Sequence, residues 1–280
     1  MNILNLINNG SNKLKLKKIV SAKLDSEILL SKTLNKRREE ILINLNETVD
    51  LKIISKFSEY IKRRSLNEPI AYITNEKEFW SKNFYVNQDT LIPRPETELM
   101  VERLLGIFKN KSIFILDIGT GSGCILISLL SELKHSKGLG IDISKKALQV
   151  AKKNAYNHKI TSNINFLKRS FEDIYDKKFD LIVSNPPYIM RKDIKNLDID
   201  IKRYEPLLAL NGGNDGLDVI KKVIYKSKSI LKKNGMLALE IGNGQYKKVS
   251  KILNRNKFRI EQIISDYKDN KRCLISSNLH

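Results

Sequence analysis

A glycine-rich turn between an apolar strand and an apolar helix constrains the fold of this chain more than any other feature. The turn lies in the segment Leu116-Asp-Ile-Gly-Thr-Gly-Ser-Gly-Cys124, and an apolar stretch from Ile125 to Leu133 follows it. Glycines let the backbone turn sharply and approach a ligand closely, and the start of a helix offers unpaired N–H groups. This order of strand, turn and helix predicts the first unit of a nucleotide-binding α/β sheet.

Beyond Pro93 the chain alternates between strand-like and helix-like segments, which predicts βαβ units and a mainly parallel sheet. The predicted strands cover residues 113–118, 139–142, 164–167, 179–184, 236–241, 258–264 and 273–276. Helices are predicted between them, for example at 145–157 and 217–232. We therefore expect a Rossmann-like α/β domain with a seven-stranded sheet.

The first 75 residues differ, because they show helical periodicity and no strand alternation. Ile53, Phe57 and Ile61 recur at the spacing of one helix face, and Glu68-Pro69 ends the pattern. From Glu78 onward, aromatic and β-branched residues lie on both sides of polar ones, as in a hairpin. The predicted organisation is a helical domain at 1–75, a β-hairpin linker at 76–92 and the α/β domain at 93–280.

Composition excludes several classes of protein. With 280 residues, 41% of them hydrophobic and 29% charged, the chain resembles an ordinary globular protein and not a disordered one. It has no apolar stretch of roughly 18 residues and no secretory leader, so we expect no membrane association and a cytoplasmic location. Cys124 and Cys273 lie far apart without clustered histidines, so we expect reduced thiols and no metal.

The charge of the chain is strongly basic. A net charge of +20, from 51 Lys and Arg against 31 Asp and Glu, suggests a nucleic-acid partner. The excess is spread almost evenly, however, and no basic cluster with interleaved aromatic residues stands out. We expect no stable nucleic-acid partner.

The residues around the glycines indicate which nucleotide the turn binds. The pattern is G-x-G-x-G followed by Cys124, whereas dinucleotide enzymes use G-x-G-x-x-G. Asp117 precedes the turn, and a carboxylate there suits a ligand with an ammonium and a sulfonium better than a pyrophosphate. Asp142 ends the second predicted strand, where it can bind both ribose hydroxyls. Together they predict S-adenosylmethionine, although Asp117 could instead cap a turn and Asp142 the helix that follows Ser144.

The chain also contains a proline-rich turn after its fourth predicted strand, in Asp180-Leu-Ile-Val-Ser-Asn-Pro-Pro-Tyr188. Pro186 and Pro187 fix their own φ, so the Pro186 carbonyl can project into a pocket as an acceptor. The side-chain oxygen of Asn185 is a second acceptor, and Tyr188 could pack against a planar substrate group. Two convergent acceptors fit a planar –NH2 group and can hold its nitrogen against a methyl carbon without a general base.

The turn does not distinguish adenine N6, cytosine N4, guanine N2 and glutamine N5 as the methylated nitrogen. Other segments carry a resemblance that does, namely Leu24-Asp-Ser-Glu-Ile-Leu-Leu30, Glu68-Pro-Ile-Ala-Tyr-Ile73, Glu78-Phe-Trp80, Leu91-Ile-Pro-Arg-Pro-Glu-Thr-Glu98, Asn185-Pro-Pro-Tyr-Ile189 and Arg203-Tyr-Glu-Pro206. With these segments and the glycine turn, the chain resembles the HemK/PrmC family over nearly its whole length. Members of that family methylate the glutamine amide of the Gly-Gly-Gln motif in class-I peptide chain release factors.

The resemblance implies a class I methyltransferase fold and assigns roles to individual residues. S-adenosylmethionine would be bound by Asp117, Gly119, Thr120, Gly121, Ser122, Gly123, Asp142, Phe171 and Asn185. Asn185, Pro186, Pro187 and Tyr188 would hold the substrate glutamine, and the N-terminal helices would dock the release factor. Two departures concern the adenine contacts, because Ser170 replaces a commonly acidic residue and Phe171 replaces a tryptophan.

Some assignments stay open at this level. Arg94 and Glu98 could form a flap over the pocket or a surface turn, and Glu205 could support the loop after Tyr188 or be solvated. The competing functions are glutamine methylation of a ribosomal protein, amino-methylation of DNA or RNA, and a non-enzymatic binding module.

Overall fold

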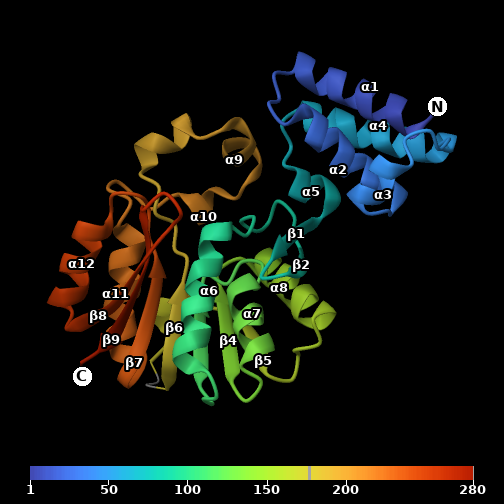
Figure 1. Cartoon of the computed structure of the whole chain (residues 1–280). Coiled ribbons are helices and arrows are strands. Elements are labelled where there is room, and N and C mark those ends of the chain that lie inside the picture. The colour runs from blue at the N-terminus through green and yellow to red at the C-terminus, as the bar shows by residue number, and fades with distance from the viewer. Residues whose placement is uncertain (176–177, 280) are drawn as a thin grey trace. The chain divides into compact units, whose positions relative to one another are not determined.

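The computed structural model describes residues 1–175 and 178–279, which form two compact units. The first unit contains Met1–Glu76 together with Asp198–Tyr204 (Figure 1). The second contains Lys77–Leu197 and the rest of the described chain from Glu205. The predicted α/β domain, at 93–280, includes residues 198–204, which the structure places in the first unit. So short a segment does not reveal from its sequence the unit against which it packs.

The first unit is mainly helical. Its helices are α1 (Ile3–Leu16), α2 (Ala22–Leu34), α3 (Arg38–Ile43), α4 (Leu51–Ser65), α5 (Ile70–Thr74) and α9 (Ile199–Tyr204). The Asn2 side chain accepts a hydrogen bond from Asn5 N and caps α1, and Asn35 ends α2 in the left-handed conformation. Apolar residues three or four positions apart form one buried cluster that includes Ile3, Leu14, Leu29, Leu30, Phe57 and Ile61.

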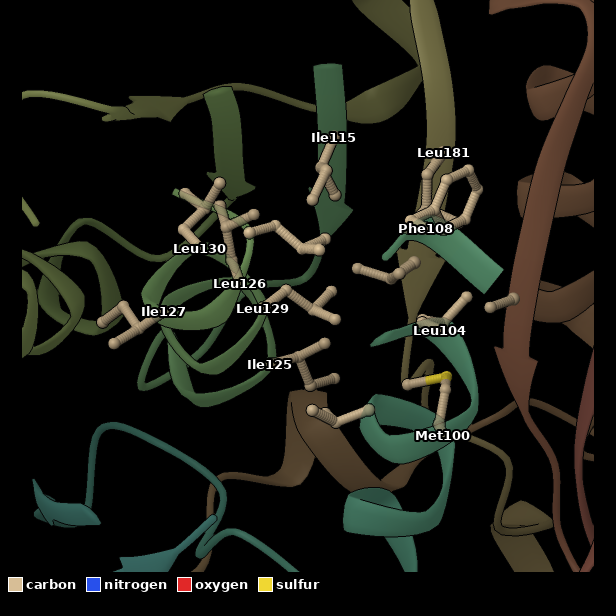
Figure 2. Close-up of a cluster of buried hydrophobic side chains, with 14 of the residues drawn as sticks. Met100, Leu104, Phe108, Ile115, Ile125, Leu126, Ile127, Leu129, Leu130 and Leu181 are labelled. Atoms are coloured by element: carbon tan, nitrogen blue, oxygen red, sulfur yellow. The ribbon is translucent and has the colours of Figure 1, made fainter. Parts of the chain in front are cut away.

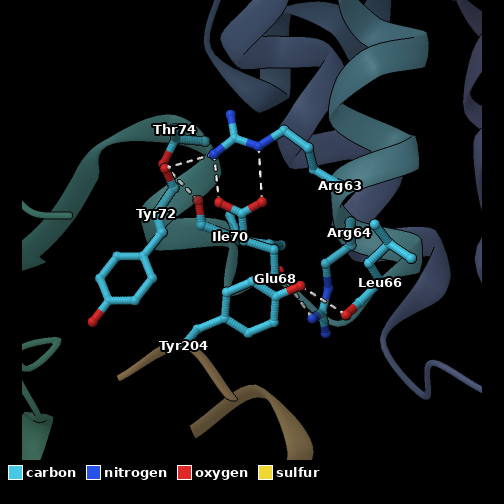
Figure 3. A network of polar contacts seen from close by, with 8 residues as sticks. All are labelled: Arg63, Arg64, Leu66, Glu68, Ile70, Tyr72, Thr74 and Tyr204. Atoms are coloured by element: carbon cyan, nitrogen blue, oxygen red, sulfur yellow. Dashed lines mark hydrogen bonds and ion pairs between the residues drawn. The ribbon is translucent and has the colours of Figure 1, made fainter. Parts of the chain in front are cut away.

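The turn after α4 is held by a polar network (Figure 3). Arg63 binds the Glu68 carboxylate through Nε and Nη2 at 2.9 and 2.5 Å. Arg64 donates to the Glu68 carbonyl oxygen at 3.2 Å, and Tyr204 of α9 donates its hydroxyl to the Leu66 carbonyl oxygen at 2.9 Å. Backbone groups that the end of a helix leaves unpaired therefore find partners, one of them from a segment distant in sequence.

The second unit alternates strands and helices along the chain (Figure 1). Its elements are β1 (Glu76–Phe79), β2 (Lys82–Tyr85), α6 (Pro95–Phe108), β3 (Phe114–Ile118), α7 (Cys124–Glu132), β4 (Lys137–Asp142), α8 (Lys145–Asn157), β5 (Ile164–Lys168), η1 (Phe171–Asp173), β6 (Phe179–Ser184), η2 (Arg191–Asn196), α10 (Leu207–Leu210), α11 (Asp218–Ile230), β7 (Leu231–Glu240), α12 (Tyr246–Arg255), β8 (Phe258–Ser265) and β9 (Lys271–Asn278). Across the described residues, none of the helices is long and apolar enough to cross a membrane.

Seven of these strands form one sheet in the order β5-β4-β3-β6-β7-β9-β8. β9 pairs antiparallel with β7 and β8, and the other pairs are parallel. The predicted seven-stranded, mainly parallel sheet is confirmed. The strand order reverses beside β3, so the carboxyl ends of β3, β4 and β6 meet where ligands bind in open α/β sheets.

Each face of the sheet has its own apolar core, because successive residues of a strand point to opposite faces. Ile115, Leu181 and Val183 pack with α6 and α7 on one face, as Figure 2 shows for Ile115 and Leu181. Leu116 and Ile182 pack with α11 and α12 on the other face. The apolar run in β6 is therefore that of a central strand covered on both sides.

The hairpin of β1 and β2 packs into the second unit. Phe79 and Phe84 are buried in the same core as α6 and α7. The side chain of Asn154 in α8 accepts from Tyr85 N at 2.7 Å and donates to the Tyr85 carbonyl oxygen at 2.9 Å. The hairpin ends at Tyr85, so residues 86–92 do not belong to it, and its aromatic residues make it part of the α/β core.

Candidate active site

A cavity of about 430 Å³ lies at the carboxyl ends of β3, β4 and β6. Nine of the residues assigned to the site from sequence line it: Gly119, Thr120, Gly121, Ser122, Asp142, Phe171, Asn185, Pro186 and Pro187. Three others do not line it: Asp117, Gly123 and Tyr188. The predicted glycine turn and proline-rich turn therefore face one cavity.

The glycine turn adopts backbone conformations that favour glycine. Gly119, Gly121 and Gly123 have φ values of 72°, 54° and 80°. Gly123 precedes α7, and a Cβ added there would lie 2.9 Å from Ile127 Cδ1 and 3.3 Å from Ala151 Cβ. Gly123 therefore allows α7 to start and to pack against α8, and it does not line the cavity.

Asp142 combines the two roles that the sequence left open. Its Oδ2 accepts from Gly121 N at 3.0 Å and its Oδ1 from Ser144 N at 2.9 Å, so it joins the glycine turn to the start of α8. It also lines the cavity. Burial raises the pKa of its carboxyl, and the hydrogen bonds from Ser144 and Gly121 oppose that rise.

Asp117 lies inside the sheet, at the level of the glycine turn. It is buried, and its Oδ2 accepts from the Thr120 hydroxyl at 2.7 Å, whereas its Oδ1 is a buried oxygen with no hydrogen-bond partner among the described residues. Burial raises the pKa of this carboxyl to about 7, the Thr120 hydrogen bond opposes that rise, and nearby Asp142 adds to it. The hydrogen bond from Thr120 agrees with the alternative that Asp117 caps the turn, and Asp117 does not line the cavity.

The proline-rich turn follows β6 directly. Ser184 donates its hydroxyl to the Ile118 carbonyl oxygen at 2.8 Å, which joins β6 to β3 at the point where both strands end. Asn185 donates from Nδ2 to the Thr97 hydroxyl at 3.4 Å. Asn185 is therefore held from one side of its amide, while the residue itself lines the cavity.

Tyr188 does not stack in the cavity as expected. Its hydroxyl donates to Glu240 Oε1 at 3.3 Å, at the end of β7. Burial, and the nearby Glu240 carboxylate, raise the pKa of Tyr188 well above its ordinary value. The Gln245 side chain also donates to the Tyr188 carbonyl oxygen at 3.0 Å, so this residue anchors the turn and does not touch the cavity.

The segment before α6 forms part of the cavity rim. Arg94 lines the cavity and pairs with the buried Glu205 at 2.5 Å, and Glu205 also accepts from Ile92 N at 3.4 Å. Glu98 instead accepts from Trp80 N at 3.1 Å and so supports the hairpin. Of the two residues considered for a flap, Arg94 lies at the cavity and Glu98 does not line it.

The family of the chain follows from comparison with known proteins. Residues 109–274 match a family model described as a methyltransferase domain, and residues 5–74 match one described as the PrmC N-terminal domain. A release factor glutamine methyltransferase from Buchnera aphidicola is 41% identical over 261 residues, which cover 93% of this chain and 94% of that protein. The chain belongs to the release factor glutamine methyltransferase family. The resemblance to the HemK/PrmC family is therefore confirmed.

Some relatives of this chain are longer. A bifunctional methyltransferase from Rickettsia typhi is 38% identical over 289 residues, which cover 96% of this chain and 56% of that protein. The chain thus spans just over half the length of that relative. A solved methyltransferase structure from Pyrococcus furiosus is 18% identical and matches with a TM-score of 0.55 over 79% of this chain and 98% of that one. This likeness confirms the predicted methyltransferase fold.

Two polar residues of the site, Thr97 and Glu240, were not predicted from the sequence. Thr97, in the first turn of α6, lines the cavity and contacts Asn185. Glu240 ends β7 and binds both Thr97 and Tyr188. A signal existed for each, because Thr97 lies within the segment 91–98 that carries the family resemblance, and Glu240 is an acidic residue at the carboxyl end of a strand.

The two residues considered for the adenine contacts, Ser170 and Phe171, lie at the cavity. Phe171 begins the short helix η1 and lines the cavity. The Ser170 hydroxyl accepts from Glu172 N at 3.2 Å and so caps η1. The residues present fit S-adenosylmethionine, because the Asp142 carboxylate and the backbone of a turn that contains Gly119 and Gly121 line the same cavity.

Proposed function

We propose that this protein transfers the methyl group of S-adenosylmethionine to the side-chain amide nitrogen of the glutamine in the Gly-Gly-Gln motif of class-I peptide chain release factors. The main support is that Asn185 and Pro186 share one cavity with the glycine turn and Asp142. Membership in the release factor glutamine methyltransferase family supports the choice of glutamine over other planar amines.

In this proposal the cofactor is bound by the glycine turn and its acidic neighbours. The backbone of residues 119–122 approaches it, Asp142 accepts from its ribose hydroxyls, and Phe171 packs against its base. The Asp142 carboxylate, which lines the cavity, favours a cationic ligand. S-adenosylmethionine supplies a methyl group on a positively charged sulfur.

The substrate amide would be held by two acceptors of the proline-rich turn. Asn185 Oδ1 and the Pro186 carbonyl oxygen each accept one N–H of the glutamine –NH2 group. This grip places the nitrogen in line with the methyl carbon and stabilises the positive charge that develops as the N–C bond forms and the S–C bond breaks. The methylated nitrogen then loses one proton to water, which requires no side chain with a strongly shifted pKa.

The protein partner is proposed from the family and from the helical first unit. Residues 5–74 match the PrmC N-terminal domain, and we propose that this unit docks the release factor. Release factors act on ribosomes, so the proposed compartment is the cytoplasm.

A methyl-transfer assay with labelled S-adenosylmethionine tests the proposal. The acceptors are a class-I release factor, the same factor with alanine in place of the Gly-Gly-Gln glutamine, a ribosomal-protein mixture, duplex DNA and rRNA. We expect label on the intact factor only, at the amide nitrogen by mass spectrometry. Label on ribosomal protein or on nucleic acid, but not on the factor, would assign one of the competing functions. Cofactor binding without transfer to any acceptor would indicate a binding module.

A further inference from the structure

Glu240 is a buried carboxylate that receives hydrogen bonds from two different segments of the site. Its side chain ends β7 and is 3% exposed. Oε2 accepts from the Thr97 hydroxyl at 2.5 Å, and Oε1 accepts from the Tyr188 hydroxyl at 3.3 Å. Thr97 belongs to α6 and Tyr188 to the proline-rich turn, so the Glu240 carboxylate links α6 to this turn. Asn185, in the same turn, contacts Thr97.

The number of protons in this chain of contacts fixes the direction of each hydrogen bond. A threonine hydroxyl has one proton, and the Glu240 carboxylate accepts both hydroxyl hydrogen bonds, which oppose the rise in its pKa that burial causes. The short contact places the Thr97 proton on the Glu240 side, so the Thr97 oxygen can only accept from its other neighbour. That neighbour is Asn185, whose Nδ2 lies 3.4 Å away.

The direction matters because an asparagine amide has two different ends. With Nδ2 donating to Thr97, Oδ1 is the end left to accept from a ligand in the cavity. A flipped amide would present N–H groups to the N–H groups of a substrate amide, and this arrangement is repulsive. The two orientations of the Asn185 amide have nearly the same shape, so its hydrogen bonds have to select the one with Oδ1 toward the substrate.

We propose that Thr97 and Glu240 are positioning residues for methyl transfer, which hold the Asn185 amide with Oδ1 toward the substrate nitrogen. The inference rests on the proposed function for the identity of that nitrogen, whereas the orientation of Asn185 does not depend on it. Thr97 acts through Asn185, and Glu240 acts through Thr97. The bond from Tyr188 to the second carboxylate oxygen fixes the carboxylate in the orientation that Thr97 needs.

A matched pair of variants separates this role from packing. Thr97→Val keeps the shape of the side chain and removes the hydroxyl, and Thr97→Ser keeps the hydroxyl and removes a methyl group. We expect Thr97→Val to lower kcat by about 10- to 100-fold, as for a reacting group held less well, with the Kd of S-adenosylmethionine nearly unchanged. Thr97→Ser should recover most of the lost rate. Equal losses in both variants would show that Thr97 only fills space.

A double-mutant cycle tests whether Thr97 acts through Asn185. In an Asn185→Ala background, Thr97→Val should cause little further loss of rate, because the group that Thr97 orients is gone. If the fold-loss of rate in the double variant equals the product of the losses in the two single variants, the two residues act independently and the proposal is contradicted. If Thr97→Val fails to fold, Glu240→Gln replaces it in the cycle, since Gln keeps the volume of Glu and offers Thr97 an N–H as readily as an oxygen.

A measurement without turnover keeps this inference separate from the proposed function. The Asn185 side-chain N–H signals are observed by ¹H–¹⁵N NMR and assigned by their loss in Asn185→Ala. In the wild type we expect the hydrogen bond to Thr97 to shift one Nδ2 proton of Asn185 downfield and to protect it from exchange. Thr97→Ser should show the same shift and the same protection. Thr97→Val should show neither the shift nor the protection. Unchanged signals in Thr97→Val would overturn the inference, even if release factors are methylated. The expected signals would support it even if the methylated substrate proves to be different.

Discussion

Asn185 and Asp142 line the same cavity, yet they hold different groups in the proposed reaction. Asn185→Ala removes an acceptor for the reacting nitrogen, so kcat should fall by roughly 100-fold or more while the Kd of S-adenosylmethionine changes little. Single-turnover rates and calorimetric titration measure the two quantities. Parallel losses of rate and affinity would place Asn185 among the cofactor ligands instead.

Asp142→Ala should have the opposite profile. It removes the carboxylate proposed for the ribose and also leaves Gly121 N and Ser144 N without their acceptor. Hydrogen bonds to a charged group contribute about 1.5 to 3 kcal/mol, so the Kd should rise by roughly 10- to 100-fold. The rate at saturating cofactor should be affected less. A normal Kd in this variant would contradict the assignment.

Asp117 gives the stability of the protein a specific dependence on pH. Its pKa is 3.8 in the unfolded chain and about 7 in the fold, because burial disfavours the charged form. Between about pH 4 and 7 the folded state therefore holds a proton that the unfolded state has released, so the free energy of unfolding falls as pH rises through this range. A pKa difference of about three corresponds to at most about 4 kcal/mol.

Asp117→Asn tests this dependence, because asparagine stays neutral in both states. Compared with the wild type, the variant should gain relative stability steadily from pH 4 to pH 7 and keep a constant difference above pH 7. Urea unfolding at several pH values measures the difference. A difference that does not vary with pH would show that Asp117 is ionised throughout or accessible to water.

Most of the site residues predicted from local patterns line the cavity, and long-range contacts explain residues that the patterns did not reveal. The glycines and Asn185-Pro-Pro-Tyr188 are recognisable because their chemistry is contained in a few adjacent residues. Thr97 and Glu240 are 143 positions apart, and only the fold brings them together. Tyr188 was expected to pack against the substrate, but its hydroxyl binds Glu240, which is 52 positions away and close to it only in the fold.

At the scale of elements, the packing of α7 on β4 depends on a residue without a side chain. A Cβ at Gly138 would lie 2.6 Å from Leu126 Cδ1 and 2.9 Å from Leu130 Cδ1. Gly138→Ala should therefore destabilise the second unit by about 1 to 3 kcal/mol through overpacking. Thermal or urea unfolding measures the loss.

Gly106 provides the matched control within α6. A Cβ at this position meets nothing within 4 Å, and its residue lies in a helix, where alanine is preferred to glycine. Gly106→Ala should stabilise the protein by about 0.5 to 1 kcal/mol. If both substitutions had the same sign, close packing between α7 and β4 would not be the cause.

Element types were predicted better than element partners. The predicted helix at 145–157 coincides with α8, because its apolar residues keep one helical face and Ser144 caps it. The hairpin was correctly expected but wrongly described as a linker, since alternation within a strand does not show what its buried face contacts. Only the structure shows that Phe79 and Phe84 of the hairpin are buried with residues of α6 and α7.

At the scale of the whole molecule, the two units should respond separately to mutation. Arg64 pairs with Asp25 inside the first unit at 2.6 Å, where their side chains are 13% and 5% exposed. Arg64→Met leaves a buried carboxylate unpaired and should cost the first unit about 3 to 5 kcal/mol. All residues that line the cavity belong to the second unit, so the Kd of S-adenosylmethionine should stay within about twofold.

The same variant tests the proposed docking role of the helical unit. Methylation of a whole release factor should decline, whereas methylation of a short Gly-Gly-Gln peptide should not. Lys36→Met is the control, because the Lys36–Glu47 pair is exposed at 35% and 42% and should contribute less than about 1 kcal/mol. Equal losses with factor and peptide would argue against docking by this unit.

The short helix α9 changes what can be exchanged between members of this family. Because residues 198–204 pack with the first 76 residues, no single cut of the backbone releases the helical unit intact. A chimera that takes only the N-terminal helices from a relative would combine them with Tyr204 of this chain. The hydrogen bond that Tyr204 donates to the Leu66 carbonyl oxygen would then form only if the imported helices present a carbonyl at the same place. Recombination that preserves partner recognition therefore has to carry two separate stretches of the gene together.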